Sequence, residues 1–153
     1  MRIWWRPSIG LWLVWVLLTL GGCAGMGNLS AQRTAVISAA QSQVGTPYRY
    51  GGNEPGRGLD CSGLTYYVHR TVGMKIPRTA AEQRLAARPV SANAPRPGDL
   101  VFFKTGPDSN HVGLMIDAER FIHASSSAHR VGYAKLRTPY WKTHYLGAGT
   151  YLD

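Results

Sequence analysis

The hydrophobic pattern of this chain changes its period before residue 99, and this change restricts the fold more than any other feature. In the first part, apolar residues recur at helical spacing. In the second part, they form short runs between turn residues, which is typical of strands. The helical segments are 34–44, 61–72 and 80–87. The strand-like segments are 99–103, 111–116 and 120–124, and the aromatic tail, 140–151, is expected to add one more strand. Helices followed by strands predict an α+β domain, with N-terminal helices packed on a central antiparallel β-sheet.

Residues 1–22 are interpreted as a lipoprotein signal peptide that is not part of the fold. Two arginines precede an apolar run at residues 9–20. This run is shorter than the ~20 apolar residues of a transmembrane helix, but it suits the core of a signal peptide. A Gly-Gly-Cys junction at Cys23 follows it and resembles the lipobox of bacterial lipoproteins. The resemblance implies cleavage before Cys23 and lipidation of that cysteine. The alternative is an uncleaved N-terminal anchor with an incidental cysteine.

The remaining chain divides into a lipidated cysteine with a tether, residues 23–33, and a domain, residues 34–153. Multiple acyl chains on Cys23 would hold the domain at a membrane without a spanning helix. Residue 24 is Ala. An Asp at this position would be the inner-membrane retention signal of enteric bacteria. In a Gram-negative source, we therefore expect a lipid-anchored protein of the outer membrane that faces the periplasm.

The charge and the cysteine content restrict the partners. The chain has a net charge of +9, which falls to +7 when the two leader arginines are removed. A basic surface suits attraction to an anionic cell wall or membrane. Because the chain has no nucleic-acid-binding motif and a periplasmic address, we expect no nucleic-acid partner. Two cysteines in dissimilar settings do not predict a disulfide framework, and the spacing of a structural zinc site is absent from the sequence.

Cys61 is the candidate nucleophile. The preceding loop, residues 45–60, holds five glycines and two prolines, and it ends at Asp60, a favourable N-cap for the helix that follows. Cys61 therefore lies in the first helical turn, where free backbone N–H groups and the helix dipole stabilise a thiolate. We expect a lowered thiol pKa at this position. The competing interpretation is a small buried core residue, which is what a lone cysteine usually is.

A reactive thiolate needs a histidine that can accept and return its proton. His69 lies on the helix of Cys61, ~12 Å further along the axis, and cannot reach the thiol. His129 and His144 lie in polar or turn-like segments and are expected to be solvated. His111 and His123 lie on two neighbouring predicted strands, so both imidazoles could face the same helix end.

Motifs along residues 34–153 resemble the NlpC family of cell-wall cysteine peptidases, and its lipoprotein members most. The Asp-Cys-Ser-Gly and His-Val-Gly boxes are together specific, whereas either alone would be weak. The matching motifs are Gly45-Thr46-Pro47-Tyr48, Gly51-Gly52, Asp60-Cys61-Ser62-Gly63, Pro77-Arg78-Thr79, Pro97-Gly98-Asp99-Leu100, Asn110-His111-Val112-Gly113 and Phe121-Ile122-His123-Ala124.

This resemblance implies a papain-like fold and hydrolysis of an amide bond in peptidoglycan stem peptides, with no metal or cofactor. The residues that match the family's functional positions carry over as follows: Cys61 as nucleophile, His111 as general base, His123 as the group that orients His111, Tyr48 near the oxyanion, and Asp60 and Ser62 as substrate contacts in some members. The loop at residues 53–57 is about one residue longer than in some relatives, which leaves substrate detail open.

Three alternatives remain open at this level. The same thiol chemistry could cut the amide between sugar and peptide, or it could transfer a lipid acyl group. The third alternative is a catalytically silent wall-binding lipoprotein, against which the intact set of one cysteine and two histidines argues. For an endopeptidase, both the γ-D-glutamyl–diaminopimelate bond and the D-alanyl–diaminopimelate cross-link are candidates. The sequence does not indicate an oligomeric state.

Overall fold

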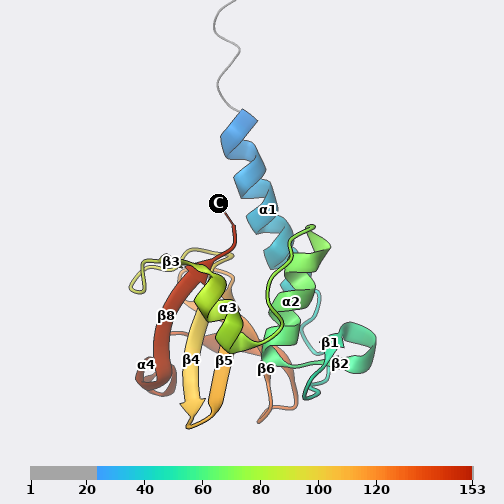
Figure 1. Ribbon diagram of the computed structural model, residues 1–153, viewed down its shortest axis with the longest axis vertical. Coiled ribbons are helices and arrows are strands. Elements are labelled where there is room, and N and C mark those ends of the chain that lie inside the picture. Colours follow the sequence, from blue (N-terminus) through green and yellow to red (C-terminus); the bar gives the residue numbers. More distant parts are fainter. Residues whose placement is uncertain (1–23, 153) are drawn as a thin grey trace, which may run out of the picture.

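Six strands form the central antiparallel sheet of the computed structural model, which describes residues 24–152 (Figure 1). The strands are β3 (Arg88–Val90), β4 (Leu100–Gly106), β5 (Ser109–Met115), β6 (Arg120–Ser125), β7 (Arg130–Lys135) and β8 (Tyr145–Thr150). Their order across the sheet is β3-β8-β4-β5-β6-β7. The helices are α1 (Ala24–Gln41), α2 (Cys61–Thr71), α3 (Ala80–Ala86) and α4 (Pro139–His144). The predicted α+β architecture, with helices before an antiparallel sheet, is confirmed.

The loop before α2 contains a small hairpin of its own. Strands β1 (Asn53–Glu54) and β2 (Gly58–Leu59) pair in antiparallel fashion around a short 3-10 helix, Pro55–Arg57. The carbonyl of Gly52 accepts a hydrogen bond from the backbone N–H of Asp60 at 3.0 Å. The loop thus ends against the first turn of α2, which fixes where that helix starts.

The sheet buries a different apolar cluster on each face. Helices α1, α2 and α3 cover one face, where the cluster includes Val36, Leu64, Val68, Leu100, Val112, Leu114, Ile122 and Ala124. The cluster on the other face comprises Val101, Phe103, Met115, Phe121 and Leu136, with Trp141 of α4 packed against it. Neighbouring residues of β5 and β6 therefore point to opposite faces, as the two-residue alternation predicted.

Helix α1 starts earlier than predicted. It begins at Ala24 rather than at Thr34, so the segment expected to be an extended tether has a helical backbone. The side chain of Arg33 is docked on the domain: its Nη1 donates to Asp99 Oδ1 at 2.9 Å and to the Pro97 carbonyl at 2.7 Å. Asp99 is fully buried, and this ion pair ties the helix to the start of β4. Arg33 therefore belongs to the folded domain.

Three elements of the C-terminal half were not predicted. Strand β3 has only three residues, one of them Pro89, which is too few to show a two-residue alternation. Strand β7 lies at the edge of the sheet, and Gly132 together with the half-exposed Tyr133 obscures its alternation. Helix α4 has only six residues, too few to show a helical period, and it begins at Pro139 directly after Thr138.

The predicted signal peptide, residues 1–22, and Cys23 lie outside the described residues. Within residues 24–152, no helix combines the length and the apolar character needed to cross a membrane.

Candidate active site

The start of α2 is held by the side chain of Asp60. Asp60 is the N-cap, with φ −92° and ψ −179°, and its Oδ1 accepts from the backbone N–H of Gly63 at 2.6 Å. Gly63 has no room for a side chain, because a Cβ there would collide with the Gly52 carbonyl. The predicted cap is confirmed, and the close approach of loop and helix explains the small residue that follows Cys61 and Ser62.

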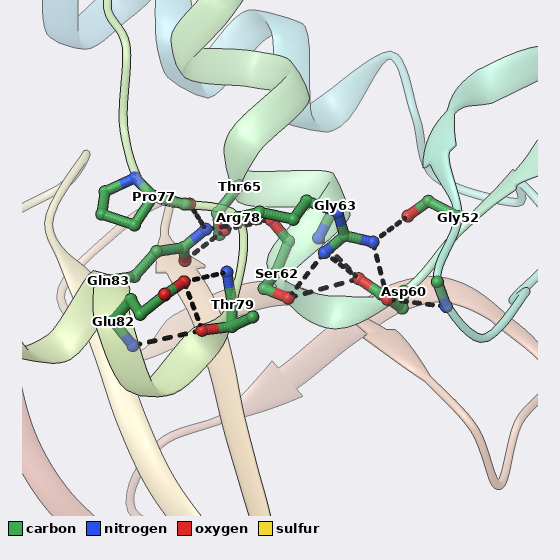
Figure 2. Close-up of polar contacts among 11 residues, drawn as sticks. Gly52, Asp60, Ser62, Gly63, Thr65, Pro77, Arg78, Thr79, Glu82 and Gln83 are labelled. Atoms are coloured by element: carbon green, nitrogen blue, oxygen red, sulfur yellow. Dashed lines mark hydrogen bonds and ion pairs between the residues drawn. The ribbon is translucent and has the colours of Figure 1, made fainter.

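Both oxygens of the Asp60 carboxylate are also held by Arg78 (Figure 2). Arg78 Nη2 lies 2.8 Å from Asp60 Oδ2, and Nη1 lies 3.0 Å from Oδ1. The same Nη1 donates to Ser62 Oγ at 2.9 Å, while Nη2 donates to the Gly52 carbonyl at 3.2 Å. The backbone N–H of Gly51 completes the shell around Oδ2 at 2.9 Å. Asp60 and Ser62 are therefore buried members of a network that fixes the first turn of α2.

Arg78 was not singled out as a site residue from the sequence. It appeared only within the Pro77-Arg78-Thr79 motif, next to the capping box that Thr79 and Glu82 form at α3. The sequence shows only that Arg78 directly precedes a helix cap. Its partner, Asp60, lies 18 residues away in the chain. Such a contact follows from the way α2 and α3 pack and not from any local pattern.

The thiol of Cys61 is neutral in this environment. Burial raises its pKa, and the charge of Asp60 raises it further, whereas the backbone N–H groups of Val112, Ser62 and Cys61 itself lower it. The expectation of a lowered thiol pKa is therefore wrong for the resting protein. The helix start supplies donors, as predicted, but desolvation outweighs them.

His111 and His123 form a hydrogen-bonded pair. His111 Nε2 lies 2.9 Å from His123 Nδ1, and the two rings are nearly perpendicular, at 85°. Burial, with a smaller contribution from the charge of a protonated His123, lowers the pKa of His111 to about 3. Burial lowers the pKa of His123 to about 4. Both imidazoles are therefore neutral at pH 7.

Trp141 of α4 packs against both imidazoles. Its ring stacks on His111, with centroids 5.5 Å apart and planes at 23°, and meets His123 edge-on at 5.1 Å. The histidines therefore lie on the face of the sheet that carries Phe103 and Phe121, opposite the face that α2 covers. Sequence reasoning missed Trp141 because the short helix that carries it was not predicted.

One cavity of about 550 Å³ brings the predicted residues together. Its lining includes Tyr48, Asp60, Cys61, Ser62, Arg78 and His111. His123 lies behind His111 and lines an adjoining cavity instead. Because the Val112 N–H reaches the thiol, Cys61 lies beside the middle of β5, at the residue that follows His111. Among the described residues, no group of three or more His, Cys, Asp and Glu side chains is placed to hold a metal ion.

The other three histidines lie elsewhere. His69 is fully buried in α2, where its Nδ1 is 2.8 Å from the Thr65 carbonyl. His129 is exposed at the β6–β7 turn with a φ of 56°. His144 is half-buried in α4, less solvated than expected, with its Nδ1 2.7 Å from the Tyr140 carbonyl. His111 is therefore the histidine that shares a cavity with Cys61.

Tyr48 contributes a hydroxyl to the same cavity. Its pKa is raised, first by burial and then by the charges of Cys61, Asp60 and Tyr50, so the phenol stays protonated. Its backbone N–H donates to the His129 carbonyl at 2.9 Å, which joins the loop to the β6–β7 turn. The cavity thus offers a thiol, a neutral imidazole and a phenolic donor, a combination suited to attack on a carbonyl.

Comparison with known proteins identifies relatives of this arrangement. The sequence profile of the NlpC/P60 family matches residues 45–150. Murein DD-endopeptidase MepH of Escherichia coli K12 is 40% identical over 138 residues, which cover 82% of this chain and 51% of MepH. Murein DD-endopeptidase MepS/Murein LD-carboxypeptidase of the same strain is 39% identical over 110 residues, which cover 71% of this chain and 57% of that protein. The chain thus spans about half the length of these curated relatives.

Solved structures show the same fold. An NLP/P60 family protein similar to a lipoprotein, from Staphylococcus aureus Mu50, has a TM-score of 0.73 and 31% identity, covering 80% of this chain and 42% of that chain. The peptidoglycan hydrolase RipB of Mycobacterium tuberculosis has a TM-score of 0.72 and 30% identity, and the match covers 83% of this chain and 68% of the RipB chain. From the matched profile, the relatives and these structures, we conclude that the chain belongs to the NlpC/P60 family.

Proposed function

We propose that this protein is a peptidoglycan endopeptidase that hydrolyses an amide bond in stem peptides, with Cys61 as nucleophile and His111 as general base. The observation that carries the proposal is the single cavity lined by both residues, behind which His123 holds the far nitrogen of His111. The names of the relatives, which include murein DD-endopeptidases, support peptidoglycan as the substrate.

The reaction begins from a neutral pair. When His111 Nε2–H donates to His123 Nδ1, the Nδ1 of His111 is left unprotonated and can accept the thiol proton. The sulfur of Cys61 then forms a bond to the amide carbonyl carbon. The C–N bond breaks as His111 returns the proton to the leaving amine. Water, activated by the same imidazole, hydrolyses the thioester, which releases the carboxylic acid and restores the thiol.

Two donors are available for the developing oxyanion. The backbone N–H of Cys61 lies in the first turn of α2, where it has no partner within the helix. The protonated Tyr48 hydroxyl lines the same cavity. Donors fixed in place before the reaction stabilise charge without reorganisation.

Asp60 and Ser62 act as positioning residues in this proposal. Their polar atoms are engaged with Arg78, Gly51 and Gly63, so they hold the helix start rather than offering free groups to a ligand. The Arg78 guanidinium also balances the Asp60 charge, which otherwise opposes formation of the Cys61 thiolate.

We further propose that Cys23 carries a lipid anchor, and that the protein faces the periplasm from the outer membrane of a Gram-negative cell. The lipobox-like junction supports this. Cys23→Ala should abolish incorporation of labelled palmitate and release the protein from the membrane fraction. Unchanged labelling and partitioning would contradict the anchor.

The catalytic proposal is tested by digesting diaminopimelate-type murein with the full-length protein and analysing the products by mass spectrometry. Stem-peptide fragments should appear with the wild type and not with Cys61→Ser. Products cut only at the sugar–peptide amide would favour the amidase instead. Full turnover by Cys61→Ser would exclude the thiol mechanism.

A further inference from the structure

A second cavity, of about 540 Å³, shares His111 with the first cavity but does not include Cys61. His123, Arg130, Gly132, Tyr140 and Trp141 contribute to its walls. None of the steps described so far uses this space. It is nearly as large as the cavity that contains the thiol, and it ends at the imidazole that would protonate the leaving group.

The register of β6 and β7 places Arg130 and Gly132 in this cavity. Gly132 pairs with His123, and Arg130 pairs with Ser125. Residues that pair directly across antiparallel strands share a face of the sheet. A Cβ on Gly132 would meet nothing within 4 Å, so the absence of a side chain at this position leaves open space beside His123.

The backbone around Arg130 is held firmly. Val131 accepts from Gly45 N at 3.0 Å and donates to the Thr46 carbonyl at 2.8 Å, while the His129 carbonyl accepts from Tyr48 N at 2.9 Å. The segment that carries Arg130 is thus fixed to the segment that carries Tyr48. These bonds hold the backbone of Arg130 beside the loop that carries Tyr48, a residue of the first cavity.

The guanidinium of Arg130 is available for a ligand. Across the described residues 24–152, no ion pair or hydrogen bond occupies it. Among the residues that line the second cavity, Arg130 has the only full charge at pH 7, since burial keeps His111 and His123 neutral. A lone arginine in a cavity with several hydroxyl groups is suited to a carboxylate, which it can hold with two parallel hydrogen bonds.

The direction of the reaction decides which part of the substrate enters this cavity. The acyl group is bonded to Cys61 in the intermediate and must occupy the first cavity. The leaving amine takes its proton from His111 Nδ1, beside the thiol, so the residue that carries the amine leaves the first cavity past the His111 ring. The second cavity adjoins the first at His111, Thr105 and Ser126 and lacks Cys61, so it is space that this residue can enter.

We propose that the second cavity binds the leaving amino acid, and that Arg130 pairs with a free carboxylate on the carbon that bears the leaving amine. This inference rests on the proposed endopeptidase function. The D-alanyl–diaminopimelate cross-link meets the requirement, because its amine sits beside a free carboxylate. In the γ-D-glutamyl–diaminopimelate bond of a tetrapeptide stem, the corresponding carboxyl group is already in an amide. Arg130 therefore selects the cross-link.

The charge pairing is tested with two cross-linked dimeric muropeptides, one with this carboxylate free and one with it converted to a carboxamide. For the full-length wild type, amidation should lower kcat/KM by about 10- to 100-fold, the range for loss of a hydrogen bond between charged groups. Arg130→Gln should lose the same factor on the free carboxylate and become insensitive to amidation. Arg130→Lys should retain part of the preference, and Lys135→Gln, on the same strand, should match the wild type. Equal sensitivity to amidation in wild type and Arg130→Gln would overturn the pairing.

The position of the subsite is tested with Gly132→Val, a change that suits a strand and whose Cβ would meet no atom within 4 Å. It should keep the variant folded, as followed by circular dichroism, and lower kcat/KM on the free-carboxylate dimer at least 10-fold. An unchanged kcat/KM would show that the leaving residue does not enter this cavity.

Binding separates this inference from the proposed function. Full-length Cys61→Ala is titrated with both dimers and the affinities are compared with those of Cys61→Ala/Arg130→Gln. An Arg130-dependent preference for the free carboxylate, without any turnover by the wild type, would reject the endopeptidase and keep the subsite. Equal affinities for the two dimers would reject the subsite, whatever the wild type cleaves.

Discussion

The guanidinium of Arg78 holds both carboxylate oxygens of Asp60, the residue that directly precedes Cys61. The pair is partly buried, and its hydrogen bonds extend to Ser62 and to the carbonyl of Gly52. One interaction thus fixes the helix start and places a positive charge against the carboxylate that raises the thiol pKa. We therefore expect Arg78 to influence the thiol as well as the fold.

Arg78→Gln should therefore affect both stability and reactivity. Removing one partner of a charged hydrogen-bonded pair costs ~1.5–3 kcal/mol of unfolding free energy. The unpaired Asp60 should also raise the thiol pKa further, which appears as an upward shift in the pH dependence of Cys61 alkylation. Arg78→Lys should lie between the two, because it keeps the charge and loses the two-pronged geometry. Arg84→Gln, on the exposed side of α3, is the control and should behave like the wild type. If Arg78→Gln and the wild type show the same pH dependence of alkylation, Arg78 does not affect the thiol pKa.

Alkylation of the wild type should be slower than that of an unperturbed cysteine at pH 7. Burial and Asp60 raise the pKa of Cys61, so little thiolate is present without substrate. The rate constant for iodoacetamide should rise with pH beyond the value at which a free cysteine levels off. Labelling of the resting protein that exceeds that of glutathione at pH 7 would indicate a preformed ion pair of Cys61 and His111 instead.

The pH dependence of activity should be displaced toward acid. The base must be neutral, and burial lowers the pKa of His111 to about 3 and that of His123 to about 4. Activity should therefore persist below pH 6.5, where an ordinary histidine would already be protonated, and should fall only toward pH 4. The measurement is kcat/KM from pH 3 to 8 on one muropeptide, with folding followed by circular dichroism. An acid limb centred near 6.5 would show that the base is a solvated histidine.

Acid should destabilise the fold through the same kind of group. Burial lowers the pKa of His69, and its Nε2 has no partner among the described residues. Below pH 6.5 these three histidines, His69, His111 and His123, bind protons in the unfolded chain but stay neutral in the folded protein. Their contribution to the free energy of unfolding is therefore fully present above pH 6.5 and is lost as the pH falls. Each such histidine contributes up to ~1.4 kcal/mol per pH unit.

His69→Phe isolates this effect from catalysis. It removes the titrating group and keeps an aromatic ring against Tyr151, which meets His69 edge-on at 5.8 Å. Thermal unfolding between pH 4 and pH 7 should show a smaller loss of melting temperature in the variant than in the wild type. Parallel curves for the two proteins would mean that His69 does not titrate differently on folding.

Local chemistry made part of this molecule predictable. The cap of α2 by Asp60 and the capping box at Thr79 each involve residues three apart, so the sequence alone contains the whole interaction. The shared face of His111 and His123 follows from alternation within strands. Their hydrogen bond needed only the additional fact that the two strands are neighbours.

The features that were missed depend on contacts between distant segments. Arg78 reaches Asp60 and Trp141 stacks on His111 only after the helices have packed on the sheet. The same holds for the thiol pKa: the helix start is visible in the sequence, whereas the desolvation that outweighs it comes from the packing of the whole domain around Cys61. Electrostatic properties of a site are thus less predictable than its residues.

The last prediction separates the two histidines, because their proposed tasks have different chemical requirements. His111 must take a proton from Cys61 and return it to the leaving amine, which an amide side chain cannot do. General acid–base transfer contributes ~10²–10⁴-fold, so His111→Asn should lose at least that much in the single-turnover rate.

His123 has only to accept a hydrogen bond from His111 Nε2 at 2.9 Å, and an amide oxygen can do this. His123→Gln should therefore keep measurable activity, and His123→Ala should lose more, since its space would no longer hold an acceptor. The pH dependence of the rate shows whether Gln only fills the space of His123 or also accepts the hydrogen bond. If it accepts the bond, the acid limb of His123→Gln should stay at low pH, because His111 remains buried. If His123→Gln is as inactive as His111→Asn while both are folded, His123 transfers a proton itself and the assignment of the two roles is wrong.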